Sequence, residues 1–75
     1  MKQHVVNEQQ FQEVLFVWKR AGRNLITLPH ISKGPSGLRV SVISIDNTVQ
    51  YIYEQEFKTY KMLFSWFGGL VDQVN

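Results

Sequence analysis

The residues best suited to acid–base chemistry in this chain are two carboxylates, Glu54 and Glu56, which stand two positions apart. In a strand this spacing puts both side chains on one face, where paired carboxylates could serve as general acid and general base. Arg39 is expected to lie across the strands from Glu54 and to form an ion pair with it. Such a pair at a solvated strand end is the more common arrangement, so these carboxylates predict no catalytic site.

The other side chains that support catalysis or metal binding form no recognisable set. The chain has no cysteine, which excludes thiolate nucleophiles, thiolate zinc sites and disulfides. Its two histidines, His4 in an N-terminal tail and His30 just after Pro29, have no neighbouring Ser–Asp arrangement of the kind found in triads. The segment 32–37 (SKGPSG) contains Gly and Lys but lacks the length of a phosphate-binding loop. We therefore predict a protein that is not an enzyme and uses no metal, cofactor or small-molecule substrate.

Length and composition restrict the remaining functions. Seventy-five residues predict one small domain, 1–75, whose thin core depends on apolar packing alone. Five Phe, three Tyr and two Trp supply that packing, and rings beyond the need of the core would form a partner surface. The net charge of +2 permits contact with polyanions without favouring it. No segment is apolar enough to span a membrane and no secretory signal is visible, so we expect no membrane contact and a cytoplasmic location.

Two β-rich runs, 38–45 and 48–57, are predicted to form an antiparallel hairpin that turns at Asp46-Asn47, because Asp and Asn tolerate the backbone of a tight turn. Closing the turn there places opposite charges across from each other and aromatic rings across from β-branched residues, both of which stabilise a sheet. The predicted pairs are Val42–Tyr51, Val40–Tyr53 and Arg39–Glu54.

Two helices are predicted to flank the strands. The first begins after Asn7, an N-cap with which Gln10 can complete a capping box, and ends before Gly22. The second begins near residue 58 and carries its apolar stripe across Gly68-Gly69, which lower helix stability by about 2 kcal/mol. We favour a continuous helix, with some group packed closely against the glycines, over a break there. The predicted stripes are Phe11, Val14, Leu15, Trp18 and Ala21 in the first helix, and Tyr60, Leu63, Phe64, Phe67, Leu70, Val71 and Val74 in the second.

Residues 24–31 are predicted to form a short edge strand, because Pro29 cannot donate a hydrogen bond to a sheet ladder. The element order predicts an α+β fold, a two-layer α-β-β-β-α sandwich. In it, a three-stranded antiparallel meander is covered on one face by both helices.

Apolar side chains outside the two stripes predict a protein-binding surface. Phe16 lies on the polar side of the first helix, and Met62 and Trp66 lie off the stripe of the second. Ser65 and Gly69 form a small-residue pair that allows close backbone approach. Exposed aromatic and Met side chains are typical of interfaces, and the alternative is that a thin core wraps these rings. The predicted partner-binding residues are Phe16, Met62, Trp66 and Gly69 on the helices, with Ile43 and Ile52 on the open sheet face.

Basic residues indicate an alternative function. Lys58 and Lys61 stand at the start of the last helix, and Lys33 stands in a loop. With the α-β-β-β-α order, this placement resembles double-stranded-RNA-binding domains, which would imply a nucleic-acid-binding module. The chain departs from that family where a Lys-Lys-x-Ala-Lys run would stand, since it reads KTYKMLF. The basic residues available to this alternative are Lys19, Arg20, Arg23, Lys33, Lys58 and Lys61.

We therefore expect an adaptor or inhibitor that binds another protein, with nucleic-acid binding as the alternative. Homodimer formation would account for the surplus rings equally well. Small domains of this kind are frequent among phage and mobile-element proteins, which is a general expectation and not a property of these residues.

Overall fold

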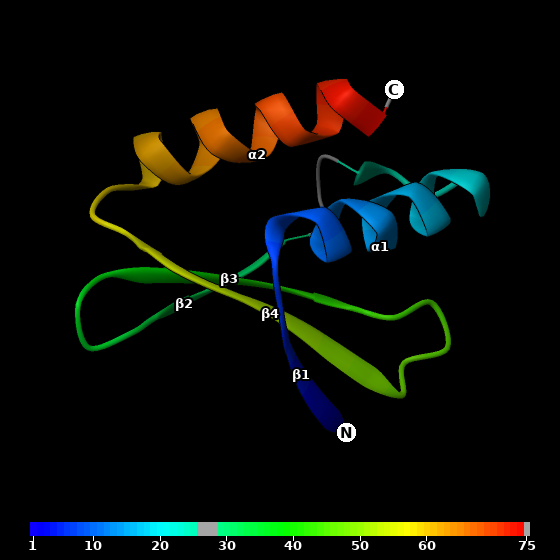
Figure 1. Ribbon diagram of the computed structural model, residues 1–75, viewed down its shortest axis with the longest axis horizontal. Helices are drawn as coiled ribbons and strands as arrows, with labels where there is room; N and C mark the ends of the chain where they lie inside the picture. Colours follow the sequence, from blue (N-terminus) through cyan, green and yellow to red (C-terminus); the bar gives the residue numbers. More distant parts are fainter. Residues whose placement is uncertain (26–28, 75) are drawn as a thin grey trace.

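The computed structural model describes residues 1–25 and 29–74 as a four-stranded sheet with two helices on one face (Figure 1). The strands lie in the order β1-β4-β3-β2. The predicted α+β class, the antiparallel meander β2-β3-β4 and the position of both helices on one face are confirmed. The elements are β1 (Lys2–Val6), α1 (Glu8–Arg20), β2 (His30–Lys33), β3 (Leu38–Ile43), β4 (Val49–Phe57) and α2 (Tyr60–Val74).

The sheet has one strand more than the sequence predicts. β1 pairs in parallel with β4, from Lys2 beside Val49 to Val6 beside Tyr53, and so places His4 in a strand and not in a terminal tail. Four of its five residues are exposed, so it lacks the apolar alternation that predicts a strand. Because β1 and β4 are parallel and each leads directly into a helix, α1 and α2 also run in the same direction (Figure 1).

The edge strand begins later than predicted. β2 starts at His30, directly after Pro29, and continues through Lys33 into the segment predicted to be a loop. Since proline has no N–H to donate, the ladder with β3 begins only after it. The predicted strand residues 26–28 lie outside the described residues.

The hairpin turns where the sequence predicts. Asn47 has a positive φ of 62°, which an asparagine in a tight turn tolerates. Val42 lies opposite Tyr51 and Val40 lies opposite Tyr53, so both predicted apolar pairs are confirmed.

The register changes at the far end of this hairpin. Arg39 and Glu54 form the predicted ion pair, with 3.1 Å between Arg39 Nη2 and Glu54 Oε1. Beyond it Leu38 pairs with Phe57, where an unshifted ladder would pair it with Gln55. This bulge brings an aromatic ring into the core in place of a polar side chain.

Helix α1 begins and ends as predicted. Asn7 Oδ1 accepts a hydrogen bond from the backbone N–H of Gln10 at 2.8 Å, and Gln10 Oε1 accepts one from the backbone N–H of Asn7 at 3.0 Å. These two bonds complete the capping box. Gly22 has a φ of 76° just beyond the helix end, a conformation that glycine adopts without strain.

Helix α2 continues through Gly68 and Gly69, as predicted, but the predicted reason is wrong. In the described chain nothing outside the helix's own backbone lies within 4 Å of a Cβ added at either glycine. The two residues therefore weaken the helix by about 2 kcal/mol relative to alanine with no compensating contact inside the chain. The helix persists because its opposite face is buried through Leu63, Phe67, Leu70 and Val74.

The core lies between the sheet and the two helices, and α2 is rotated relative to its predicted stripe. Tyr60 and Phe64 are each 53% exposed, so their assignment to the core is wrong, whereas Trp66 packs against the core. The buried hydrophobic residues are Phe11, Leu15, Leu25, Leu38, Val40, Val42, Phe57, Leu63, Phe67, Leu70 and Val74.

The hairpin turn predicts a stability that depends on pH. Asp46 Oδ1 accepts hydrogen bonds from Ser44 Oγ and Thr48 Oγ1, each at 2.6 Å, and from Thr48 N at 3.1 Å. These bonds, that of Ser44 above all, lower the pKa of Asp46 from 3.8 to about 2. Because Asp46 has a lower pKa in the folded protein than in the unfolded chain, its stabilising effect is fully present above pH 3.8. That effect is lost as the pH falls through about 2.

Asp46→Ala should therefore lower the melting temperature at neutral pH and flatten its decline between about pH 4 and 2. Thermal unfolding followed by circular dichroism across that range measures both effects. Glu13→Ala, which removes an exposed carboxylate outside the turn, is the matched control and should keep the wild-type pH dependence. An unchanged decline in Asp46→Ala would contradict the role of the turn.

Candidate protein-interaction surface

The predicted partner-binding residues fall on two opposite faces of the molecule. Ile52 lines the sheet face that the helices leave open, and strand alternation places Ile43 on the same face. The sheet and the core separate these two from the others, so no single flat partner contacts both groups. The residues carried by the helices are Phe16, Met62, Trp66 and Gly69.

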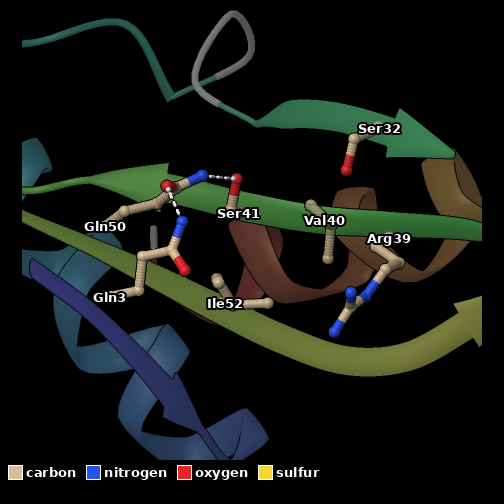
Figure 2. A pocket seen from close by; sticks show the side chains of 7 residues that line it. All are labelled: Gln3, Ser32, Arg39, Val40, Ser41, Gln50 and Ile52. Atoms are coloured by element: carbon tan, nitrogen blue, oxygen red, sulfur yellow. Dashed lines mark hydrogen bonds between the residues drawn. The ribbon is translucent and has the colours of Figure 1, made fainter. Parts of the chain in front are cut away.

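The open sheet face carries a small polar hollow beside Ile52 (Figure 2). Gln3 Nε2 donates to Gln50 Oε1 at 3.2 Å, and Gln50 Nε2 donates to Ser41 Oγ at 2.9 Å (Figure 2). Ser41 Oγ in turn donates to the backbone oxygen of His30 at 3.4 Å. This chain of hydrogen bonds links all four strands. We assign a structural role to these polar groups, because they satisfy one another across the sheet.

Trp66 differs most from its predicted place. Its ring stacks on Tyr53 with 4.8 Å between the centroids, and it contacts Phe57 and Phe11 at tilted angles with centroids 5.3 and 5.6 Å away. Its indole N–H donates to the Glu8 carboxylate. The interpretation of Trp66 as a side chain off the core is therefore wrong. These four rings, the Trp66 cluster, join α1, α2 and β4.

Helical spacing alone could not distinguish the two flanks of α2. Phe64 and Trp66 lie on opposite sides of the buried row that contains Leu63 and Phe67, each about 70–90° from its centre. The flank that becomes buried is the one with aromatic partners on β4 and α1. Contacts between distant segments decide which ring is buried, and the spacing within one helix does not contain them.

Burial in the cluster also changes the ionisation of Tyr53. Burial, and to a smaller extent the nearby Glu8 carboxylate, raises the pKa of Tyr53 above its ordinary value of 10.0. Its hydroxyl donates to Gln55 Oε1 at 2.8 Å. The side chain is therefore neutral at physiological pH and acts in packing.

Phe16 and Met62 are exposed, as predicted, with 48% and 51% of their surfaces accessible. Phe16 lines an open hollow between the helices, the Phe16 hollow. In it the side-chain amide of Gln12 donates to Gln73 Oε1 at 3.1 Å. Met62 lines a second open hollow beside β4, which Trp66 also lines. Both hollows lie along the same flank of α2. Met62 and Trp66 line the hollow near the start of the helix, and Gln73 lines the Phe16 hollow near its end.

The helices expose more apolar side chains than the sequence predicts. Val17, Tyr60 and Phe64 join Phe16 and Met62, and each of the five is about half exposed. The rings of Tyr60 and Phe64 stack with 6.2 Å between their centroids. We call these five residues the outer helix surface. Their four-residue spacing made Tyr60 and Phe64 look like core residues, and only the rotation of α2 identifies them as exposed.

The basic residues form two groups that do not meet. Lys19, Arg20 and Arg23 lie at and just beyond the end of α1, whereas Lys58 and Lys61 lie at the start of α2. These ends are at opposite extremes of the long axis of the molecule (Figure 1). The turn from β2 to β3, which follows Lys33 on β2, lies at the same extreme as the start of α2 (Figure 1).

The group at the end of α1 is engaged within the chain. Lys19 Nζ donates to the backbone oxygen of Val74 at 3.1 Å, where a cation suits the end of a helix. The guanidinium of Arg23 lies 4.9 Å from the ring centroid of Trp18, a cation–π contact. The basic residues thus form no continuous stripe of the kind that follows a nucleic-acid backbone.

Comparison of the chain with protein-family models, with curated proteins and with solved structures finds no match. Within residues 1–25 and 29–74, no three His, Asp or Glu side chains are grouped closely enough to hold a metal ion. Neither helix, over the residues described, has both the length and the apolar composition to cross a membrane.

Truncation to alanine should separate core residues from surface residues. Leu63→Ala should cost about 2–5 kcal/mol of unfolding free energy through the cavity it leaves. Trp66→Ala removes the centre of the aromatic cluster and should cost about 2–4 kcal/mol. Phe16→Ala should stay within about 0.5 kcal/mol of wild type. Urea unfolding at low protein concentration measures all three. Equal losses for Phe16→Ala and Leu63→Ala would contradict the exposure of Phe16.

Proposed function

We propose that this protein is a small non-enzymatic binding protein that acts as an adaptor or inhibitor through protein–protein interaction. The observation that supports it is the outer helix surface, where five large apolar side chains stand about half exposed on only two helices. Large exposed apolar side chains among polar groups are typical of interaction sites. A partner that covers these side chains would gain the hydrophobic stabilisation that the chain alone forgoes.

The proposed centre of contact is the Phe16 hollow. Phe16 offers an aromatic ring beside the paired amides of Gln12 and Gln73, and the guanidinium of Arg20 lies 5.9 Å from the ring centroid. Aromatic residues, Phe included, and Arg are enriched in the cores of protein interfaces. This arrangement suits a partner with an apolar side chain for the ring and a carboxylate or carbonyl for Arg20.

Met62 adds an exposed apolar side chain to the proposed contact surface on α2, and Trp66 holds that part of α2 in place. Met62 is exposed and flexible, and an unbranched thioether adapts to different partner shapes. Trp66 lines the same hollow but is held in its cluster, so it fixes the position of the flank on which Met62 stands. Ile43 and Ile52, on the opposite face, are not included in the proposed surface.

Nucleic-acid binding is the weaker candidate, because the basic residues lie in two groups at opposite ends of the molecule. Affinity for duplex RNA depends on many phosphate contacts made together. The cytoplasmic location stays a prediction from the sequence, and the origin in a phage or mobile element stays a general expectation for small domains of this kind.

Photo-crosslinking tests the proposed function. Benzoylphenylalanine in place of Phe16 should form, in an extract of the source cells, a nuclease-resistant adduct with one discrete protein. An excess of unmodified chain should compete the adduct away, whereas the Phe16→Ala chain should not, because it lacks the ring that anchors the contact. The same probe in place of Val5, an exposed apolar residue on β1, is the matched control.

Equal labelling from positions 5 and 16 would contradict the proposal, as would an adduct that the Phe16→Ala chain displaces as well as wild type does. An adduct lost on nuclease treatment would favour the nucleic-acid alternative.

A further inference from the structure

The charges of α2 are in an unfavourable order for a helix that acts alone. Lys61 stands in its first turn and Asp72 near its end, and they are its only charged residues. The helix dipole favours an anion at the start and a cation at the end. Helix α1 has that favourable order, with Glu8 in its first turn and Lys19 and Arg20 in its last. Lys19 of α1 supplies a cation at the end of α2 through its hydrogen bond to the backbone oxygen of Val74, but no contact is described that pairs Lys61 or Asp72 with an opposite charge.

Lys61 and Asp72 lie on one line along the exposed side of α2. Eleven residues make about three turns, so the two side chains project within about 20° of each other and stand about 16 Å apart along the axis. Ser65 and Gly68 continue the same line between them, and all four residues are exposed. A Cβ added at Gly68 would meet nothing within 4 Å. The line is therefore a narrow strip of small residues with opposite charges at its ends.

Exposed apolar side chains flank this strip. Tyr60 and Phe64 stack along one side of it, and Met62 stands on the other, where Gly69 leaves the helix backbone uncovered. Large rings beside exposed glycines provide both the projections and the depressions that a close helix contact needs.

We infer that this face binds α2 of a second copy of the chain, with the two helices antiparallel. An antiparallel register that places Lys61 beside Asp72 of the second copy also places Ser65 beside Gly68. The Phe64 side chains of the two copies then lie along one edge of the contact, and the two Gly69 residues lie along the other. Each contact occurs twice because a two-fold axis relates the copies. Each charge then lies beside an opposite charge and beside the end of the partner helix whose dipole it complements.

The second copy suits this face better than an unrelated helix. An unrelated partner would need a cation and an anion at the same spacing and in reversed order, which the second copy provides by symmetry. The paired face takes Tyr60, Met62 and Phe64 from the outer helix surface but excludes Phe16 and Val17, which lie on α1. Self-association and binding at the Phe16 hollow can therefore succeed or fail separately.

Sedimentation equilibrium over a series of protein concentrations, combined with charge reversal, tests the inference. The wild-type mass should rise from 8.8 kDa toward twice that value. Lys61→Asp and Asp72→Lys should each weaken self-association at least about tenfold, because each brings like charges together. An equimolar mixture of the two variants should associate again, since every contact then joins opposite charges. Lys58→Asp, the same charge change outside α2, should associate like wild type.

Gly68→Ala gives a second readout that does not depend on charge. Because the added Cβ meets nothing in the single chain, this variant should raise the melting temperature of the dilute monomer and weaken self-association. A wild-type chain that stays at 8.8 kDa at the highest concentration would overturn the inference. Charge-reversed variants that associate like wild type, or a mixture that does not associate again, would overturn the antiparallel register.

Discussion

The Trp66 cluster determines which surfaces this protein presents. By stacking on Tyr53 and contacting Phe11 and Phe57, Trp66 fixes the rotation of α2 about its own axis. That rotation buries one flank of the helix and leaves Phe64 on the other, exposed side. A helix turned so that the opposite flank met the sheet would bury different rings and would expose a different face to partners. The proposed interactions therefore depend on a packing contact that takes no part in binding.

The parallel pairing of β1 with β4 provides the second constraint. Two strands that run the same way, each followed directly by a helix, place α1 and α2 side by side in one direction. The hydrogen bonds from Trp66 to Glu8 and from Gln12 to Gln73 then join the helices along their shared flank. The Phe16 hollow exists because of this arrangement.

Local signals in the sequence predicted much of the fold, and contacts between distant segments account for the rest. The capping box at Asn7 and the hairpin turn at Asn47 follow from a few neighbouring residues, and both are confirmed. Strand β1 has no apolar alternation, because an exposed edge strand needs none, so the sequence pattern does not predict it. The exposure of Phe16 followed from helical spacing, whereas the burial of Trp66 and the exposure of Phe64 depend on neighbours from other elements.

The cover of α2 by a second copy can be measured in one experiment, since the chain has no cysteine and an introduced thiol is a unique reporter. The thiol of Ser65→Cys should react with a maleimide as fast as an exposed thiol when the protein is dilute, and more slowly as the concentration rises. Ser36→Cys, in the exposed turn between β2 and β3, should react at one rate throughout. A slow reaction of Ser65→Cys at every concentration would contradict the exposure of this face of α2 in the single chain, and a fast one at every concentration would contradict its cover by a second copy.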